Sequence, residues 1–265
     1  MTRLIAPAGR TLRLLLVTVA VLHALSLTVN VLHRGLESAP FVHFDWVYAF
    51  LDVDQEHNLP TWFASSLLLF SALVLAEIGI TAGRVGDRFA RHWKVLALVF
   101  VFLALDEATQ IHEAANVLRD AFDLTGLLYL SWILVAMPLV VLFALAYLRF
   151  LGHLPKPVRL LVLVGGALYV GGAVGMEVVG SVLWDNGPGY DSMAYAFSTA
   201  VEELLEMLGS VSFLYGVASY LHRYPPSADG SPVQETVTRR TGGILAVGGR
   251  HAPGPGFPGQ PRSVP

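Results

Sequence analysis

Long apolar runs dominate this chain, and carboxylates interrupt them with no Lys or Arg among them. Eight acidic residues lie in stretches that otherwise have the length and apolarity of membrane-spanning helices: Glu77, Asp106, Glu107, Glu113, Glu177, Glu202, Glu203 and Glu206. An acidic side chain near the centre of a bilayer costs about 2.5–3.5 kcal/mol. We therefore expect protons, hydrogen bonds in a wet cavity or bound cations to neutralise these groups.

The composition favours a multi-pass membrane protein. Of the 265 residues, 54% are hydrophobic and 14% are charged, and the mean hydropathy is +0.59. A soluble domain carries about 25% charged residues. Nucleic-acid binding is not expected, because the basic residues are scattered and form no aromatic-basic face. The absence of Cys excludes disulfides and thiolate metal sites.

The apolar runs predict an all-α fold, a bundle of six transmembrane helices. The predicted helices are Thr11–His33, Thr61–Ala82, His92–Asn116, Leu127–Arg149, Val158–Val182 and Ser192–His222. The connections between the second and third helices and between the fourth and fifth are basic, whereas those on the other side are acidic. The positive-inside rule then places both termini in the cytoplasm of a bacterial inner, or plasma, membrane.

The two ends of the chain differ in character. The run Leu14–Leu32 follows three arginines but is too long for the apolar part of a signal peptide, so we interpret it as an uncleaved first helix. Residues 1–224 form the predicted transmembrane domain. Residues 225–265 are rich in Pro and Gly and predict a disordered cytoplasmic tail.

Three shorter patterns predict local structure. The aromatic stretch Phe41–Tyr48 in the first external loop is typical of an interfacial or re-entrant helix. Asn58 followed by Pro60 is a helix start signal. The pattern Gly171-x3-Gly175 predicts close packing between two membrane helices.

Polar side chains from several helices are expected to meet in one layer in the outer half of the membrane. At 100° per residue, Asp106, Gln110 and Glu113 form one stripe on the third helix, flanked by Glu107 and His112. The sixth helix carries Glu202, Glu203 and Glu206, whose spacings of three and four bring all three to one site. Further candidates for the same layer are Glu177, Gln110, Asn30 and His33.

These residues form a candidate metal site. Carboxylates with one or two imidazoles suit Zn, Mn or Fe, and helical bundles supply Glu from several helices in di-metal carboxylate proteins. The interval of five residues between Glu107 and His112 departs from the Glu-x2-His spacing of those proteins. The candidate metal ligands are Asp106, His112, Glu113, Glu203 and Glu206.

The leading hypothesis is a metal-dependent, hydrolase-like membrane enzyme acting on a lipid or another amphiphile. A metal-bound water would be the nucleophile, and Glu107 or Glu202 the general base. A second hypothesis is a proton- or cation-coupled transporter, in which protonated carboxylates exchange protons. Alternating access usually requires two structural repeats that move against each other, and the six predicted helices contain no repeat. A transporter of this kind would therefore need a homo-oligomer, in which a second copy supplies the other repeat. The third hypothesis is an assembly or scaffold subunit.

Three strings resemble those of a family of small bacterial multi-pass membrane proteins of uncharacterised function. They are Asn58-Leu-Pro-Thr-Trp-Phe, Leu105-Asp-Glu-x4-His-Glu113 and Glu202-Glu-x2-Glu-Met207. The resemblance extends over about 12–224. It implies the six-helix membrane fold and no particular reaction.

Overall fold

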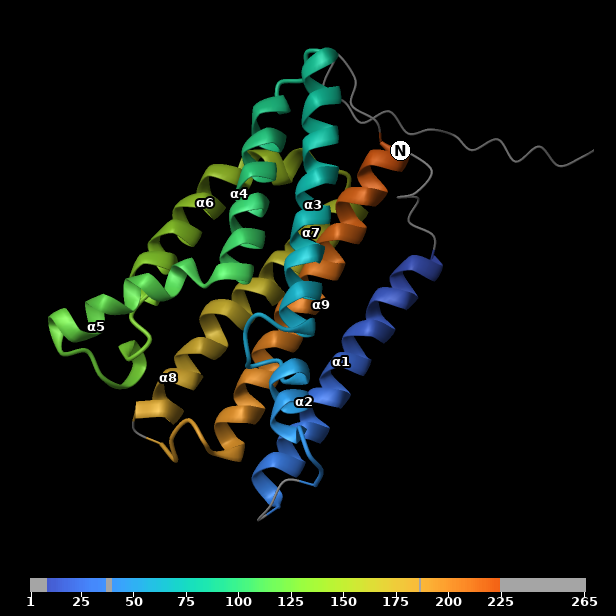
Figure 1. Cartoon of the computed structure of the whole chain (residues 1–265). Helices are drawn as coiled ribbons and strands as arrows, with labels where there is room; N and C mark the ends of the chain where they lie inside the picture. Colours follow the sequence, from blue (N-terminus) through green and yellow to red (C-terminus); the bar gives the residue numbers. More distant parts are fainter. Residues whose placement is uncertain (1–8, 37–39, 186, 225–265) are drawn as a thin grey trace, which may run out of the picture. The chain divides into compact units, whose positions relative to one another are not determined.

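The structure is a computed structural model that describes residues 9–36, 40–185 and 187–224. Helices account for 84% of these residues, and no strand occurs among them, which confirms the predicted all-α fold (Figure 1). The predicted tail, 225–265, lies outside the described residues.

The long helices are apolar enough to cross a membrane. Among the described residues five helices meet this description, and there are six spans when α4 and the bent segment after it are counted as one. The spans are α1 (Gly9–Gly35), α3 (Leu59–Arg84), α4 (Ala90–Thr109), α6 (Ile133–His153), the continuous run of α7 (Lys156–Val170), η3 (Gly171–Met176) and α8 (Glu177–Asp185), and α9 (Met193–Arg223). The shorter elements are α2 (Phe44–Leu51), η1 (Ile111–Asn116), α5 (Val117–Phe122) and η2 (Gly126–Leu128).

Two local predictions are confirmed. The aromatic stretch of the first connection contains a helix, α2, as predicted, whereas its interfacial or re-entrant placement stays a prediction. The helix α3 begins where the start signal predicts, because the side chain of Asn58 accepts the backbone N–H of Thr61 at 3.1 Å and Pro60 occupies the first turn. This cap satisfies one of the N–H groups that a helix start leaves without a backbone partner.

The prediction of one straight helix over His92–Asn116 is wrong. The backbone of Gln110 has a left-handed conformation (φ 55°, ψ 39°). The helical segments before and after it, 90–109 and 111–122, meet at an angle of 74°. The Asp106 carboxylate stabilises this break, since its Oδ1 accepts the backbone N–H of His112 at 2.7 Å. Aspartate side chains often accept hydrogen bonds from nearby backbone N–H groups, which then do not bond to the carbonyls of a helix. The third predicted helix is therefore α4 followed by the short elements η1 and α5.

The fourth predicted helix also begins later than expected, at Ile133 instead of Leu127. The residues before it form η2 and a turn that are tied to α8. The backbone N–H of Gly126 donates to Asp185 Oδ2 at 2.6 Å, and the N–H of Leu130 donates to Ser181 Oγ at 3.2 Å. These tertiary hydrogen bonds replace the helical ones that the apolar run predicts.

The helix α9 lies at the centre of the packing and contacts α1, α3, α7, η3 and α8 (Figure 1). Its closest approach is to the face that carries Gly165 and Gly172. A Cβ added at Gly165 would lie 2.8 Å from the carbonyl oxygen of Gly209, and one at Gly172 would lie 2.7 Å from that of Glu202. At Gly171 and Gly175 an added Cβ would meet nothing within 4 Å. The predicted Gly171-x3-Gly175 contact is therefore wrong, and the contact uses glycines seven residues apart, on one helix face.

An apolar core fills one end of the bundle and leaves the other end to polar groups. Trp93 near the start of α4 lies 4.6 Å from the ring of Phe150 and 4.8 Å from that of Tyr220 near the end of α9. Leu75 and Ile78 of α3 are fully buried in the same core. The opposite halves of α4 and α9 carry the acidic residues.

Candidate functional site

A cavity of about 520 Å³ lies where the acidic halves of α4 and α9 come together with η1, η3 and α8. Nine carboxylates line it: Asp54, Glu56, Asp106, Glu107, Glu113, Glu177, Glu202, Glu203 and Glu206. Two histidines, His57 and His112, line it as well, whereas no Lys or Arg of the described residues does. The lining is therefore anionic unless protons or cations neutralise it.

The α9 side of this acidic cavity carries Glu202, Glu203 and Glu206 on adjacent turns. Glu203 lies within electrostatic range of Glu206 and of Glu107 on α4. The stem of Glu206 packs on η3, where a Cβ added at Gly172 would lie 2.8 Å from Glu206 Cγ. The absence of a side chain at Gly172 thus lets η3 approach the acidic turn of α9 closely.

The α4 side is shaped by the break at Gln110. Asp106 Oδ2 lies 3.0 Å from Nδ1 of His112, and Oδ1 of the same carboxylate binds the His112 backbone. The imidazole also packs 4.8 Å from the ring of Trp132. These contacts hold the ring in one orientation, and its Nε2 is the ring nitrogen that has no carboxylate partner among the described residues.

Glu177 approaches the cavity from the start of α8. Its Oε1 accepts a hydrogen bond from Trp132 Nε1 at 2.9 Å. Trp132 precedes α6, so this bond links the wall formed by α8 to the chain entering α6. Trp132 was not among the residues singled out from the sequence, and one tryptophan among five gives no signal by itself.

Sequence reasoning also missed Asp54 and Glu56 as cavity residues, because they belong to the acidic connection between α2 and α3 and not to a predicted transmembrane helix. Burial, and then the charge of nearby Asp52, raises the pKa of Asp54 to about 6. Burial likewise raises the pKa of Glu56. Oδ2 of Asp54 and Oε2 of Glu56 are buried atoms without a hydrogen-bond partner among the described residues. Both carboxylates line the acidic cavity.

The structure brings together most residues proposed from the sequence. Asp106, His112, Glu113, Glu203 and Glu206, proposed as metal ligands, all line the acidic cavity, as do Glu107, Glu202, Glu177 and Gln110. Asn30 and His33 do not line it. Asn30 donates to Asp52 Oδ1 at 2.6 Å and accepts from Arg34, and His33 stacks on Tyr48 with ring centroids 4.1 Å apart.

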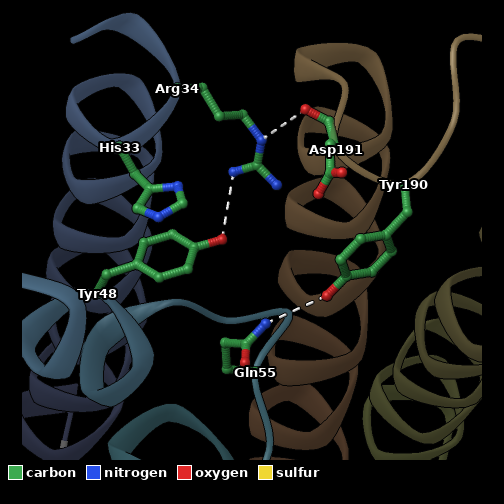
Figure 2. A pocket seen from close by; sticks show the side chains of 6 residues that line it. All are labelled: His33, Arg34, Tyr48, Gln55, Tyr190 and Asp191. Carbon is green, nitrogen blue, oxygen red and sulfur yellow. Dashed lines mark hydrogen bonds between the residues drawn. The ribbon is translucent and has the colours of Figure 1, made fainter. Parts of the chain in front are cut away.

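A second cavity, of about 340 Å³, lies beside α1 and α2 and is lined by His33, Arg34, Tyr48, Gln55, Tyr190 and Asp191 (Figure 2). The Arg34 guanidinium donates to the Tyr48 hydroxyl at 3.4 Å and to the backbone oxygen of Asp191 at 3.2 Å. Gln55 and Tyr190 line both cavities, and Gln55 Nε2 donates to the Tyr190 hydroxyl at 3.2 Å (Figure 2). This hydrogen bond lies at the boundary between the second cavity, which contains Arg34, and the acidic cavity, which no Lys or Arg of the described residues lines.

In the described part of the chain, no three His, Asp or Glu side chains are close enough together to hold a metal ion as they stand. The carboxylates of α4 and α9 nevertheless share one cavity with an oriented imidazole. Flexible glutamates that converge by a change of rotamer would supply oxygen ligands, which together with imidazole suit Zn, Mn or Fe.

Residues 12–221 match a family model whose description is "Domain of unknown function (DUF8692)". The match covers well over half of the chain, so the chain belongs to this family, and it includes every residue that lines the acidic cavity. No curated protein and no solved structure matches the chain.

Proposed function

We propose that this member of the DUF8692 family is a multi-pass membrane protein that binds a divalent metal ion in the acidic cavity. Through that ion it would act on a lipid or another amphiphile. The observation that carries the proposal is the gathering of nine carboxylates in one cavity without a Lys or Arg of the described chain. Carboxylates this close repel each other when ionised, so protons or bound cations must neutralise them.

Glu107, Glu203 and Glu206 would supply oxygen ligands, with Glu113 nearby, and Nε2 of His112 the nitrogen ligand. Asp106 takes a different role from the one expected of it, since it already holds Nδ1 of His112 at 3.0 Å. A metal-binding histidine commonly donates its other ring N–H to a carboxylate, which fixes the ring and increases its basicity. A metal-activated water would be the nucleophile, and Glu202 would be the general base.

The size of the acidic cavity supports a molecule in addition to an ion. A metal ion needs only a few ligand atoms around it, whereas the cavity measures about 520 Å³. Sites for small molecules measure about 300–1,000 Å³. Trp132, Trp184 and Leu130 provide apolar surface on its wall, which suits a ligand with both polar and apolar parts.

The orientation in the membrane is part of the same proposal. Arg84 ends α3, Arg88 lies in the loop that follows and Arg91 lies in the first turn of α4. At the same end of the next helix pair, Arg149 lies in the last turns of α6 and Lys156 begins α7. Cytoplasmic loops are rich in Lys and Arg, which favours cytoplasmic termini and an acidic cavity in the outer half of a bacterial inner membrane.

Metal analysis of the purified full-length chain tests the proposal. We expect the native chain, purified in a nonionic detergent, to contain or take up about one or two divalent ions per chain, as di-metal carboxylate sites do. Glu203→Gln and Glu206→Gln should each weaken metal uptake by at least about tenfold, because loss of a charged ligand costs more than about 1.4 kcal/mol.

Glu77→Gln is the matched control, since Glu77 is an exposed glutamate of α3 that does not line the cavity. Its metal uptake should equal that of the native chain. The proposal fails if the native chain neither contains nor takes up Zn²⁺, Mn²⁺ or Fe²⁺, or if the control loses as much metal as the cavity variants.

A proton- or cation-coupled transporter is the second candidate. The break of α4 at Gln110 and the π-helical segment η3 both border the acidic cavity. Interrupted helices beside a binding site are typical of secondary transporters. Uptake into proteoliposomes that is driven by a pH gradient and persists after chelation of metals would favour this candidate over the enzyme.

A further inference from the structure

Three aromatic rings form one wall of the acidic cavity, which we call the aromatic wall: Trp184 of α8, Tyr190 of the following loop and Tyr195 of α9. The centroid of Trp184 lies 4.9 Å from that of Tyr190 and 5.5 Å from that of Tyr195, and the two tyrosines are 5.1 Å apart. Each ring therefore contacts both others. This contact fixes the wall as one unit at the cavity surface.

Asp54 lies beside this wall. Burial, followed by the charge of Asp54, raises the pKa of Tyr190 to about 12, which reflects the closeness of the carboxylate to the phenol. Oδ2 of Asp54 has no hydrogen-bond partner among the described residues although it is buried. A buried carboxylate oxygen without a partner is costly unless something in the cavity pairs with it.

Aromatic rings and carboxylates together select a particular kind of cation. The faces of Trp and Tyr attract cations by about 0.5–2 kcal/mol, and quaternary ammonium groups are the ligands most often recognised in this way. Aromatic rings do not coordinate Zn²⁺, Mn²⁺ or Fe²⁺, whose ligands are imidazole, carboxylate or thiolate. The faces of these three rings are thus unsuited to the proposed metal.

We propose that the aromatic wall and Asp54 bind the quaternary ammonium group of the molecule on which the protein acts. The substrate class is then an amphiphile with a methylated ammonium head, whose positive charge lies between the rings and Asp54. This inference rests on the proposed function, because it identifies the second occupant of the same cavity. The nine carboxylates that line the cavity attract a cationic head group when ionised, whereas they would repel an anionic one.

Calorimetric titration of the full-length chain in a nonionic detergent tests the inference. The probes are choline and 3,3-dimethylbutan-1-ol, which has the same shape with carbon in place of the charged nitrogen. We expect choline to bind the native chain at least about tenfold more tightly than the neutral probe, from cation–π attraction and one buried carboxylate together. Equal affinity for both probes would overturn the inference without any variant.

The variants Asp54→Asn and Trp184→Leu should each weaken choline binding by about fivefold to tenfold. Their controls are Asp45→Asn and Trp46→Leu, which make the same changes at exposed positions of α2 outside the cavity. The controls should bind choline as the native chain does. If Asp54→Asn and Trp184→Leu fold and bind choline like their controls, the inference is wrong.

Metal content measured on the same samples separates this inference from the proposed function. A chain that holds metal but does not prefer choline refutes only the ammonium site. A chain that prefers choline but takes up no metal refutes only the metal site.

Discussion

Asp52 is a buried acidic residue, with 1% of its surface exposed. It lines neither of the two cavities. Its Oδ1 accepts hydrogen bonds from Ser26 Oγ at 3.0 Å and from Asn30 Nδ2 at 2.6 Å. Its backbone oxygen accepts from Asn58, the cap of α3, at 2.6 Å. The residue therefore ties α1 to the start of α3, and so places the cavity residues Asp54 and Glu56.

Ser26→Ala should destabilise the protein through this link. Ser26 Oγ donates to Asp52 and also accepts the backbone N–H of Val53 at 3.0 Å, so its loss leaves two buried groups short of a partner. We expect the free energy of unfolding to fall by about 1–3 kcal/mol. Denaturant unfolding in detergent micelles, followed by circular dichroism, measures the change.

Ser66→Ala is the control, because within the described part of the chain the Ser66 hydroxyl donates only to the carbonyl of Trp62 in its own helix, α3. Its unfolding free energy should stay within about 0.5 kcal/mol of the native value. An equal loss in both variants would show that the Asp52 link contributes nothing of its own.

The sequence could not reveal the role of Asp52. In the sequence it is one of several acids in an external connection, and its partners on α1 are 22 and 26 residues away. The polar stripe on the first predicted helix was visible, but it was assigned to the layer of the acidic cavity. The structure pairs Asn30 with Asp52 and Arg34 instead.

Among the elements, α7 and α9 make the close backbone contact that continues to the wall of the acidic cavity at Gly172. The backbone of α9 reaches α7 so closely that a Cβ at Gly165 would lie 2.8 Å from both the Gly209 oxygen and the Phe213 nitrogen. Atoms of two backbones cannot move aside as a flexible side chain can. The same face continues to Gly172, where η3 meets the acidic turn of α9.

Gly165→Ala should therefore lower the unfolding free energy by about 1–3 kcal/mol, the usual cost of overpacking. Gly166→Ala is the matched control on the neighbouring position, since a Cβ there would meet nothing within 4 Å. The control should be neutral or slightly stabilising, because Ala favours helix more than Gly does by about 1 kcal/mol. Thermal unfolding of both variants in the same detergent measures the difference, and equal melting temperatures would contradict the packing argument.

The helices themselves were largely predictable. Apolar runs of about 20 residues and charged connections located the spans, because hydrocarbon admits only backbone that satisfies its own hydrogen bonds. The break at Gln110 was not predictable, since the run from His92 to Asn116 has no Pro or Gly to mark it. It depends on the carboxylate of Asp106 capturing the backbone N–H and ring nitrogen of His112.

For the molecule as a whole, the acidic cavity makes cation binding depend on pH. A cation binds the ionised form of Asp54, so binding releases a proton and affinity rises with pH. The carboxyl of Asp54 has a pKa of about 6, raised from 3.8 by burial and by Asp52. Choline affinity should therefore fall by about fourfold to fivefold between pH 7.5 and pH 5, because the protonated carboxyl, like Asn in Asp54→Asn, binds the cation about fivefold to tenfold more weakly than the carboxylate does.

Calorimetric titrations across this range measure the effect. In Asp54→Asn the remaining dependence should be clearly weaker, with Glu56, whose pKa burial also raises, as a further contributor. The prediction is wrong if native affinity is constant from pH 5 to pH 7.5, or if the variant keeps the full dependence.

The sequence by itself determined that this chain is helical, suited to a membrane, and rich in carboxylates that hydrocarbon would not tolerate alone. Those properties follow from side-chain chemistry and helical periodicity, which are local. The tertiary structure decided which residues share one cavity, because it added Asp54, Glu56 and Trp132 to the predicted set and placed Asn30 and His33 elsewhere. Such neighbours are set by long-range packing and hydrogen bonds between distant segments, and no local pattern in the sequence records them.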